Sequence, residues 1–185
     1  MPAVVAHYLA SMTEQIPPDT KDWTWVLDEQ CRECGVAAGE VDVDQIPDQI
    51  RAAVPRWLTA LASPDVRSRP APTVWSALEY AAHVRDVNLV FSERLRLMLD
   101  DDGARFANWD QDEAAITGRY SELEPADVAG ALAAGSEELA SAVEQLRPED
   151  LDRRGLRSNG SEFTVRTLLQ YYLHDNLHHL HDVGA

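Results

Sequence analysis

The feature that most constrains the fold is a helical repeat of apolar residues in four separate segments. In each one, apolar side chains recur every three or four positions, which places them on one face of an α-helix. The segments cover residues 47–61, 76–99, 126–146 and 163–182. Patterns typical of strands are nearly absent. The chain is therefore predicted to be all-α, an up-and-down four-helix bundle with one long crossover connection.

Local signals mark where these helices begin and bend. Ser76 and Glu79 have the spacing of a capping box, and Thr164 is a suitable N-cap for the last segment. Pro55 lies inside the first segment and is expected to kink or split it. The long connection after the second segment is expected to contain a short helical turn at residues 113–117.

The first 45 residues lack the helical repeat. We expect residues 1–45 to form an irregular N-terminal arm that packs its tryptophans on the outside of a bundle formed by residues 46–185. Residues 1–12 have neither a basic region nor a cleavage site typical of a secretory signal. No apolar run is long enough to span a bilayer, so a cytoplasmic protein is the expectation.

The charge of the chain narrows the range of partners. A formal net charge of -16 would repel nucleic acid phosphates and anionic membranes, and 45% hydrophobic residues exclude wholesale disorder. We therefore expect no nucleic acid and no membrane partner. A small-molecule substrate is the expected ligand, and a homodimer is left open.

Four of the six histidines, His174, His178, His179 and His181, fall within eight residues near the C-terminus. His174 and His178 are four apart, so they lie one turn from each other on one helix face and can share a metal ion. His83 lies on the apolar face of the second segment. The pattern predicts a metal-binding triad of His83, His174 and His178.

Other readings of the histidines stay open. The cluster could be a histidine-rich tail produced by composition alone, and His83 could be a core residue bonded to a carbonyl or to Asp86. His178 and His181 with His83 form a rival triad. His179 follows His178 directly and points about 100° away from it, so we expect it outside the ligand shell.

Further residues are candidates for the surroundings of the metal. Three carboxylates could fix the histidine tautomers: Asp86, Asp175 and Asp182. Four side chains are candidates for a pocket wall: Tyr80, Tyr171, Trp109 and Asp110. No residue stands out as a general base, so no catalytic residue is assigned.

Both cysteines lie in one C-x-x-C motif, Cys31 to Cys34. The motif alone leaves three roles open: structural residues, a redox pair, or half of a metal site completed from elsewhere. The cysteines lie in a segment without a predicted helix and bear no spacing relation to the histidines. We expect them not to be ligands of the histidine site.

Two stretches of sequence carry a resemblance to a known family. These are WSALEYAAHVRD at residues 75–86 and YLHDNLHH at residues 172–179. With them the chain resembles the DinB-like superfamily, metal-binding four-helix bundles that include the metal-binding domain of mycothiol-dependent maleylpyruvate isomerase and the bacillithiol transferases. The resemblance extends from about Pro47 to the C-terminus, and residues 22–35 look like an extension carried by an actinobacterial-looking subgroup.

The resemblance implies a divalent metal, usually zinc or nickel, held by His83, His174 and His178. It also implies activation of a low-molecular-weight thiol such as mycothiol, in a transferase or isomerase reaction. The alternative is a non-catalytic metal-binding or stress-associated module. A site with an exchangeable position would favour the enzyme, and a coordinatively closed site would favour the module.

Overall fold

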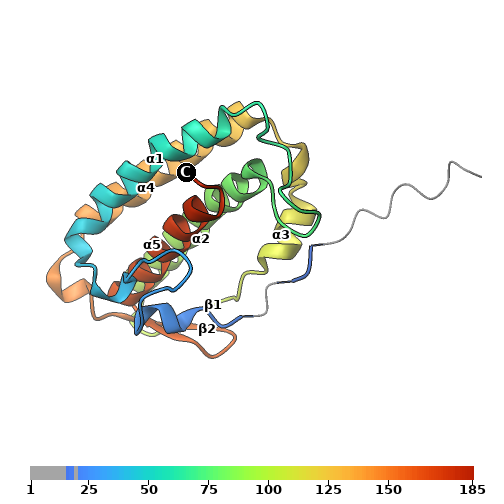
Figure 1. The fold of residues 1–185 in the computed structure, drawn as a ribbon. Helices are drawn as coiled ribbons and strands as arrows, with labels where there is room; N and C mark the ends of the chain where they lie inside the picture. The colour runs from blue at the N-terminus through green and yellow to red at the C-terminus, as the bar shows by residue number, and fades with distance from the viewer. Residues whose placement is uncertain (1–15, 19–20) are drawn as a thin grey trace, which may run out of the picture.

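The computed structural model describes residues 16–18 and 21–185 as a bundle of helices with a small sheet at one end (Figure 1). The α-helices are α1 (Ile46–Leu61), α2 (Ala77–Asp100), α3 (Gln111–Thr117), α4 (Pro125–Glu144) and α5 (Val165–Asp182). The strands are β1 (Ala104–Phe106), β2 (Arg154–Arg157) and β3 (Glu162–Thr164). The 3-10 helices are η1 (Thr24–Leu27), η2 (Ala38–Glu40), η3 (Val43–Gln45), η4 (Tyr120–Glu122) and η5 (Pro148–Asp150). The predicted all-α four-helix bundle is confirmed.

The helices begin where the capping signals predict. Ser76 Oγ accepts a hydrogen bond from the backbone N–H of Glu79, and the Glu79 carboxylate accepts one from the backbone N–H of Ser76. Thr164 caps α5 through the N–H of Thr167. Pro55 does not split the helix, because α1 continues through this residue. Pro55 lies on the exposed side, where water can satisfy the carbonyl that loses its partner.

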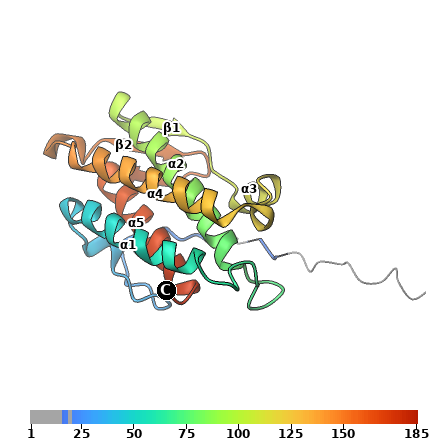
Figure 2. The ribbon, with the colours of Figure 1, turned by 90° about the horizontal axis from the view of Figure 1, so that it is seen from above.

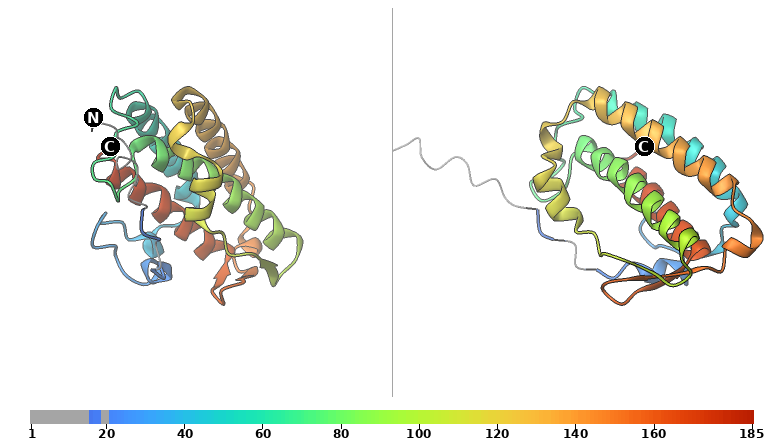
Figure 3. Two further views of the ribbon diagram at one scale, coloured as in Figure 1. Left: turned by 90° about the vertical axis from the view of Figure 1, so that its right-hand side faces the viewer. Right: turned by 180° about the vertical axis from the view of Figure 1, so that it is seen from behind.

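The order of the helices around the bundle follows from the long crossover. α4 and α5 each pack against both α1 and α2, so α1 and α2 lie diagonally opposite (Figure 2). β1 follows α2 and pairs in parallel with β2, which follows α4. α2 and α4 therefore end at the same end of the bundle and run in the same direction (Figure 3). The crossover through α3 and η4 returns the chain along the length of the bundle.

The three-stranded sheet was not predicted from the sequence. β2 pairs with β3 in antiparallel fashion, with Gly155 opposite Phe163. A Cβ on Gly155 would lie 2.6 Å from the Phe106 ring and 2.7 Å from Met98 Sδ, so the sheet packs closely on the end of α2 only with glycine here. Strands this short give no periodic signal in a sequence.

A chain of buried polar side chains links all four long helices. The Trp57 indole on α1 donates to the side-chain oxygen Oδ1 of Asn176 at 2.9 Å, and the side-chain Nδ2 of Asn176 donates to the Tyr172 hydroxyl at 3.1 Å. Tyr172 in turn donates to Asn88 on α2 at 2.7 Å, and Asn88 donates to Ser136 on α4 at 3.1 Å. Each of these side chains has a hydrogen-bond partner. The row of hydrogen bonds therefore fixes the positions of the four helices relative to one another.

The described part of the arm lies along α5. Gln170 on α5 donates to the backbone carbonyls of Gly39 at 3.0 Å and Val41 at 2.9 Å, and Val26 is fully buried. A Cβ on Gly39 would lie 1.9 Å from the Leu27 carbonyl oxygen, so only glycine allows the turns of the arm to meet. Residues 1–15, which include the stretch expected not to be a secretory signal, lie outside the described residues. Within the described chain, no helix combines the length and apolar character needed to cross a membrane.

Candidate metal centres

α5 presents two pairs of metal-binding side chains on adjacent faces. His174 and His178 form one pair four residues apart, and Asp175 and His179 form the next pair, rotated by about 100°. Different elements face the two pairs. As a result the described residues form two groups of candidate ligands on adjacent faces of α5, each with its donor atoms within 4.8 Å of one another.

The first group, called the α2–α5 group, consists of His83, Asp175 and His179. His83 is fully buried, its Nε2 lies 3.4 Å from Asp175 Oδ1, and its ring centre lies 4.8 Å from that of His179. Among the described residues, both ring nitrogens of His83 and Oδ1 of Asp175 are buried and have no hydrogen-bond partner of good geometry. Buried polar atoms are normally satisfied, so His83 Nε2 and Asp175 Oδ1, which lie next to each other, are the two that a shared cation would satisfy.

Asp182 orients one histidine of this group. His179 Nδ1 lies 2.8 Å from Asp182 Oδ2, which leaves Nε2 on the side of Asp175, 3.9 Å from its Oδ1. A carboxylate on the far nitrogen of a histidine fixes the tautomer that a metal requires. The geometry thus matches the role predicted for Asp182. Asp175, predicted for the same outer role, lies among the donors instead.

Asp86, the third predicted outer carboxylate, has other partners. It accepts hydrogen bonds from the Tyr120 hydroxyl at 2.5 Å and from Arg85 Nε at 2.7 Å. Tyr120 belongs to η4, so this contact ties the crossover connection to α2. The two hydrogen bonds of Asp86 therefore go to Tyr120 and Arg85, and neither goes to a histidine.

The protonation states of the α2–α5 group suit a metal. Burial lowers the pKa of His83, which favours the neutral imidazole that binds metals. Burial alone would raise the pKa of Asp175, but the close approach of His83 and the neighbouring histidines His179 and His174 outweighs it and lowers the pKa to about 2. Near neutral pH the group therefore offers the neutral imidazole of His83 and the carboxylate of Asp175.

Aromatic rings enclose the α2–α5 group. Trp109 stacks on His83 with centroids 5.4 Å apart, Trp75 lies 5.4 Å from the same ring, and Tyr80 lies 5.0 Å from His179. A cavity of about 60 Å³ adjoins the group, lined by Trp23, Gln111, Tyr171, His174, Asp175, His178 and His179. Of the predicted wall residues, Tyr80, Trp109 and Tyr171 lie here, whereas Asp110 caps α3.

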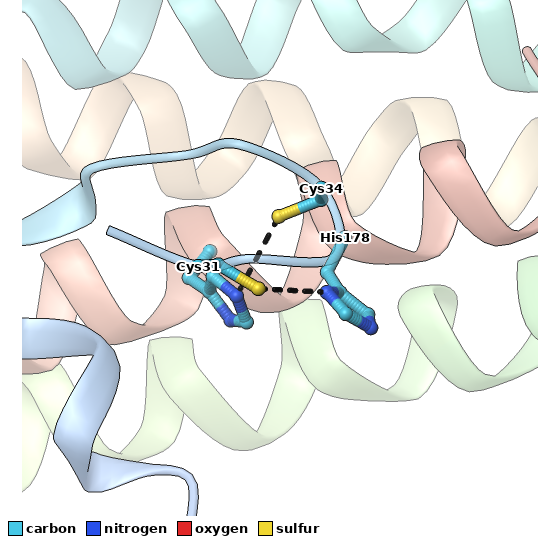
Figure 4. A group of neighbouring side chains, drawn as sticks. Cys31, Cys34 and His178 are labelled. Atoms are coloured by element: carbon cyan, nitrogen blue, oxygen red, sulfur yellow. Dashed lines mark hydrogen bonds between the residues drawn. The ribbon is translucent and has the colours of Figure 1, made fainter. Parts of the chain in front are cut away.

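The second group, called the arm–α5 group, consists of Cys31, Cys34, His174 and His178. Cys31 Sγ lies 3.7 Å from His178 Nδ1 (Figure 4). Cys34 Sγ lies 3.7 Å from His174 Nε2. Cys31 is fully buried, and both histidines are less than a tenth exposed. The cysteines were expected not to be ligands of the histidine site; the structure brings both of them beside His174 and His178, and metal binding itself tests the expectation.

The sequence-predicted triad is divided between the two groups. His83 lies in the α2–α5 group, whereas His174 and His178 lie in the arm–α5 group. His181 is exposed and belongs to neither. The triad stays a prediction, since metal binding itself decides it. Sequence reasoning missed His179 as a donor because it compared His179 only with His178 and not with Asp175, four residues earlier.

Comparisons with known proteins agree with this architecture. A family model described as the DinB superfamily matches residues 46–183. A solved structure is similar with a TM-score of 0.66 and 12% sequence identity, over 77% of this chain and 83% of that chain. That structure is YfiT from Bacillus subtilis, described as "a probable metal-dependent hydrolase with an unusual four-helix bundle topology". At this identity the likeness shows the fold alone. No curated protein matches the chain.

Proposed function

The chain belongs to the DinB superfamily, and on this premise we propose that it is a divalent-metal-dependent enzyme whose centre is the α2–α5 group. The observation that carries the proposal is that His83 Nε2 and Asp175 Oδ1, both buried and 3.4 Å apart, have no hydrogen-bond partner among the described residues. Two atoms of metal-binding type left unsatisfied side by side are costly, and a cation held between them would satisfy both.

The donor set favours particular metals. Two imidazole nitrogens and one carboxylate oxygen suit zinc, nickel or iron better than magnesium or calcium, which prefer oxygen ligands alone. Three protein ligands leave at least one coordination position for a small molecule. A divalent ion held there would supply a Lewis acid that lowers the pKa of a bound nucleophile towards 7.

A low-molecular-weight thiol is the first candidate nucleophile, in a transfer or isomerisation reaction of the kind implied by the family resemblance. In that reaction Asp182 orients His179, and the rings of Trp75, Tyr80 and Trp109 exclude bulk water from the donors. No side chain is assigned as general base. We keep the cytoplasm as the proposed location.

Water is a second candidate nucleophile, and the size of the cavity favours it. About 60 Å³ beside Asp175 and His179 has room for a few water molecules but not for a peptide-sized thiol. YfiT, the similar structure, is described as a probable metal-dependent hydrolase. A thiol would need the arm residue Trp23, which lines the same cavity, to move aside. A non-catalytic metal-binding module is the remaining alternative.

Metal content tests the location of the centre. The protein, purified without an affinity tag, is analysed for metals as the wild type and as the variants His83→Ala and His174→Ala, with His181→Ala as the control. We expect His83→Ala to lose the metal of the α2–α5 group, and His181→Ala to lose none because it is exposed. If His83→Ala and His174→Ala instead remove the same single ion, the triad predicted from the sequence is right and our assignment is wrong.

Activity assays separate the nucleophiles. Wild type and His83→Ala are assayed for consumption of an electrophile with and without added thiol, and for hydrolysis of activated esters and amides without thiol. Turnover that depends on thiol and on His83 supports transfer or isomerisation. Turnover that depends on His83 but needs no thiol supports hydrolysis. Full metal loading without either activity favours the non-catalytic module.

A further inference from the structure

The arm–α5 group has the donor geometry of a second metal site. In a tetrahedral zinc site with Zn–S bonds near 2.3 Å and Zn–N bonds near 2.1 Å, sulfur and nitrogen ligands lie about 3.6 Å apart. Both cysteine–histidine pairs measured here, Cys31 with His178 and Cys34 with His174, lie 3.7 Å apart. All four donors lie within 4.8 Å of one another, so a single ion can reach all of them.

The chemistry of the donors selects the metal. Two thiols and two imidazoles form a mixed sulfur–nitrogen set that suits zinc and excludes magnesium and calcium. On α5 the histidines are one turn apart, and in the arm the cysteines are held by a tight turn. In that turn Gly35 has φ +76, and its N–H donates to the Cys31 carbonyl at 2.8 Å. The turn aims both sulfurs at α5.

The outer contacts of His178 fit the same conclusion. Its Nδ1 faces Cys31, whereas its Nε2 lies 3.6 Å from Glu33 Oε2 and 3.8 Å from Asp182 Oδ1. Carboxylates on the nitrogen that faces away from a metal are the usual outer partners of a histidine ligand. Glu33 belongs to the C-x-x-C turn itself, so the turn supplies both ligands and an outer carboxylate.

The group is closed to substrates. Four protein donors complete a tetrahedron and leave no position for a fifth group. The Trp23 ring covers the histidines, with its centroid 5.7 Å from that of His174 and 5.0 Å from that of His178. The α2–α5 group, in contrast, has three donors, which leave a coordination position open; the cavity of about 60 Å³ is lined by histidines of both groups, so the contrast rests on the number of donors. The two groups therefore suit different tasks.

We infer that Cys31, Cys34, His174 and His178 bind one structural zinc ion that fastens the N-terminal arm to α5. The ligands come from segments 140 and 147 residues apart in sequence, so the ion acts as a cross-link between the arm and the last helix. On binding, both thiols lose a proton to solvent and both histidines remain neutral. This site is independent of the reaction proposed for the α2–α5 group.

Zinc-edge X-ray absorption of His83→Ala tests the inference, because this variant keeps all four ligands of the arm–α5 group. We expect about one zinc per chain, with two sulfurs at about 2.3 Å and two nitrogens at about 2.0–2.1 Å. Cobalt(II) in place of zinc should give the absorption of a tetrahedral thiolate complex. Zinc without sulfur ligands, or a chain without zinc, would overturn the inference.

A double variant, Cys31→Ser with Cys34→Ser, provides the complementary measurement. It should lose about one metal equivalent relative to wild type, while the metal that depends on His83 remains. Unchanged metal content, or an oxidised Cys31–Cys34 pair in protein purified under reducing conditions, contradicts the site. The absorption experiment uses a chain with both cysteines intact, so the inference can be tested even if the double variant does not fold. If wild type and His83→Ala hold the same single zinc with sulfur ligands, the proposed function is refuted and this site stands.

Discussion

At the scale of single residues, Asp182 stands between the two groups. Its carboxylate lies 2.8 Å from His179 Nδ1 in the α2–α5 group and 3.8 Å from His178 Nε2 in the arm–α5 group. Burial would raise the pKa of Asp182, but the contacts with His179 lower it overall, so the carboxylate is ionised near neutral pH. The same charge thus supports a donor histidine in each group.

We predict that Asp182→Asn weakens metal binding at the α2–α5 group by about 10- to 100-fold, the usual effect of losing an outer carboxylate. The measurement is a competition titration against a chelator in the background of Cys31→Ser with Cys34→Ser, so that only this group contributes. Asp152→Asn, an exposed site with the same change of charge, is the control. Equal affinities for the two variants would show that Asp182 has no such role.

The limits of the sequence prediction also belong to this scale. Spacing on α5 identified His174 and His178 as a pair, but Asp175 and His179 have the same spacing. Which residues complete each pair depends on what packs against each face of α5. The positions of His83 on α2 and of the C-x-x-C turn relative to α5 are set by tertiary packing, which spacing within one segment does not encode. The helices themselves were predictable because capping and periodicity are local.

At the scale of helices, the buried polar chain through Tyr172 holds the bundle in register. We predict that Tyr172→Phe lowers the free energy of unfolding by about 1–3 kcal/mol, because Asn88 Oδ1 and Asn176 Nδ2 each lose a buried partner. The phenyl ring keeps the packing, so far-UV circular dichroism should be unchanged. Urea denaturation measures the effect, and a loss below about 0.5 kcal/mol would mean that water replaces the hydroxyl.

The start of α2 gives a prediction about pH. Glu79 is buried at the cap of α2. Burial raises its pKa, but the hydrogen bonds from the Arg69 guanidinium and from Ser76 lower it by a larger amount, so the pKa lies below 4.5. A pKa lower in the folded than in the unfolded state contributes stability above about pH 4.5 that is lost as the pH falls. Glu79→Gln should cost about 1–3 kcal/mol at pH 7, since Arg69 loses its charged partner.

The same variant should show a flatter decline in stability than wild type when the pH is lowered from 5 to 3. Denaturation series at fixed pH values, with metal removed from both proteins by a chelator, check this difference. Parallel declines in the two proteins would assign the acid sensitivity to other carboxylates.

At the scale of the whole molecule, the arm is joined to the bundle mainly through α5. We predict that removal of metal, or the double cysteine substitution, exposes the arm to trypsin at Arg32, whose side chain is 89% exposed but whose neighbouring cysteines are held in place. Zinc-loaded protein should be cut at this bond at least tenfold more slowly. Mass spectrometry of the fragments over time identifies the bond, and equal rates would show that metal does not hold the arm.

The distance along the chain between the cysteines and their histidines has a consequence for biosynthesis. Ribosomes add about 5–20 residues per second, so His174 and His178 are made roughly 7–30 s after Cys31 and Cys34. During that interval the thiols are on a nascent chain without the imidazoles opposite them. The cross-link can therefore form only after the last helix has been translated, and a chain interrupted before that point carries both thiols without either imidazole ligand.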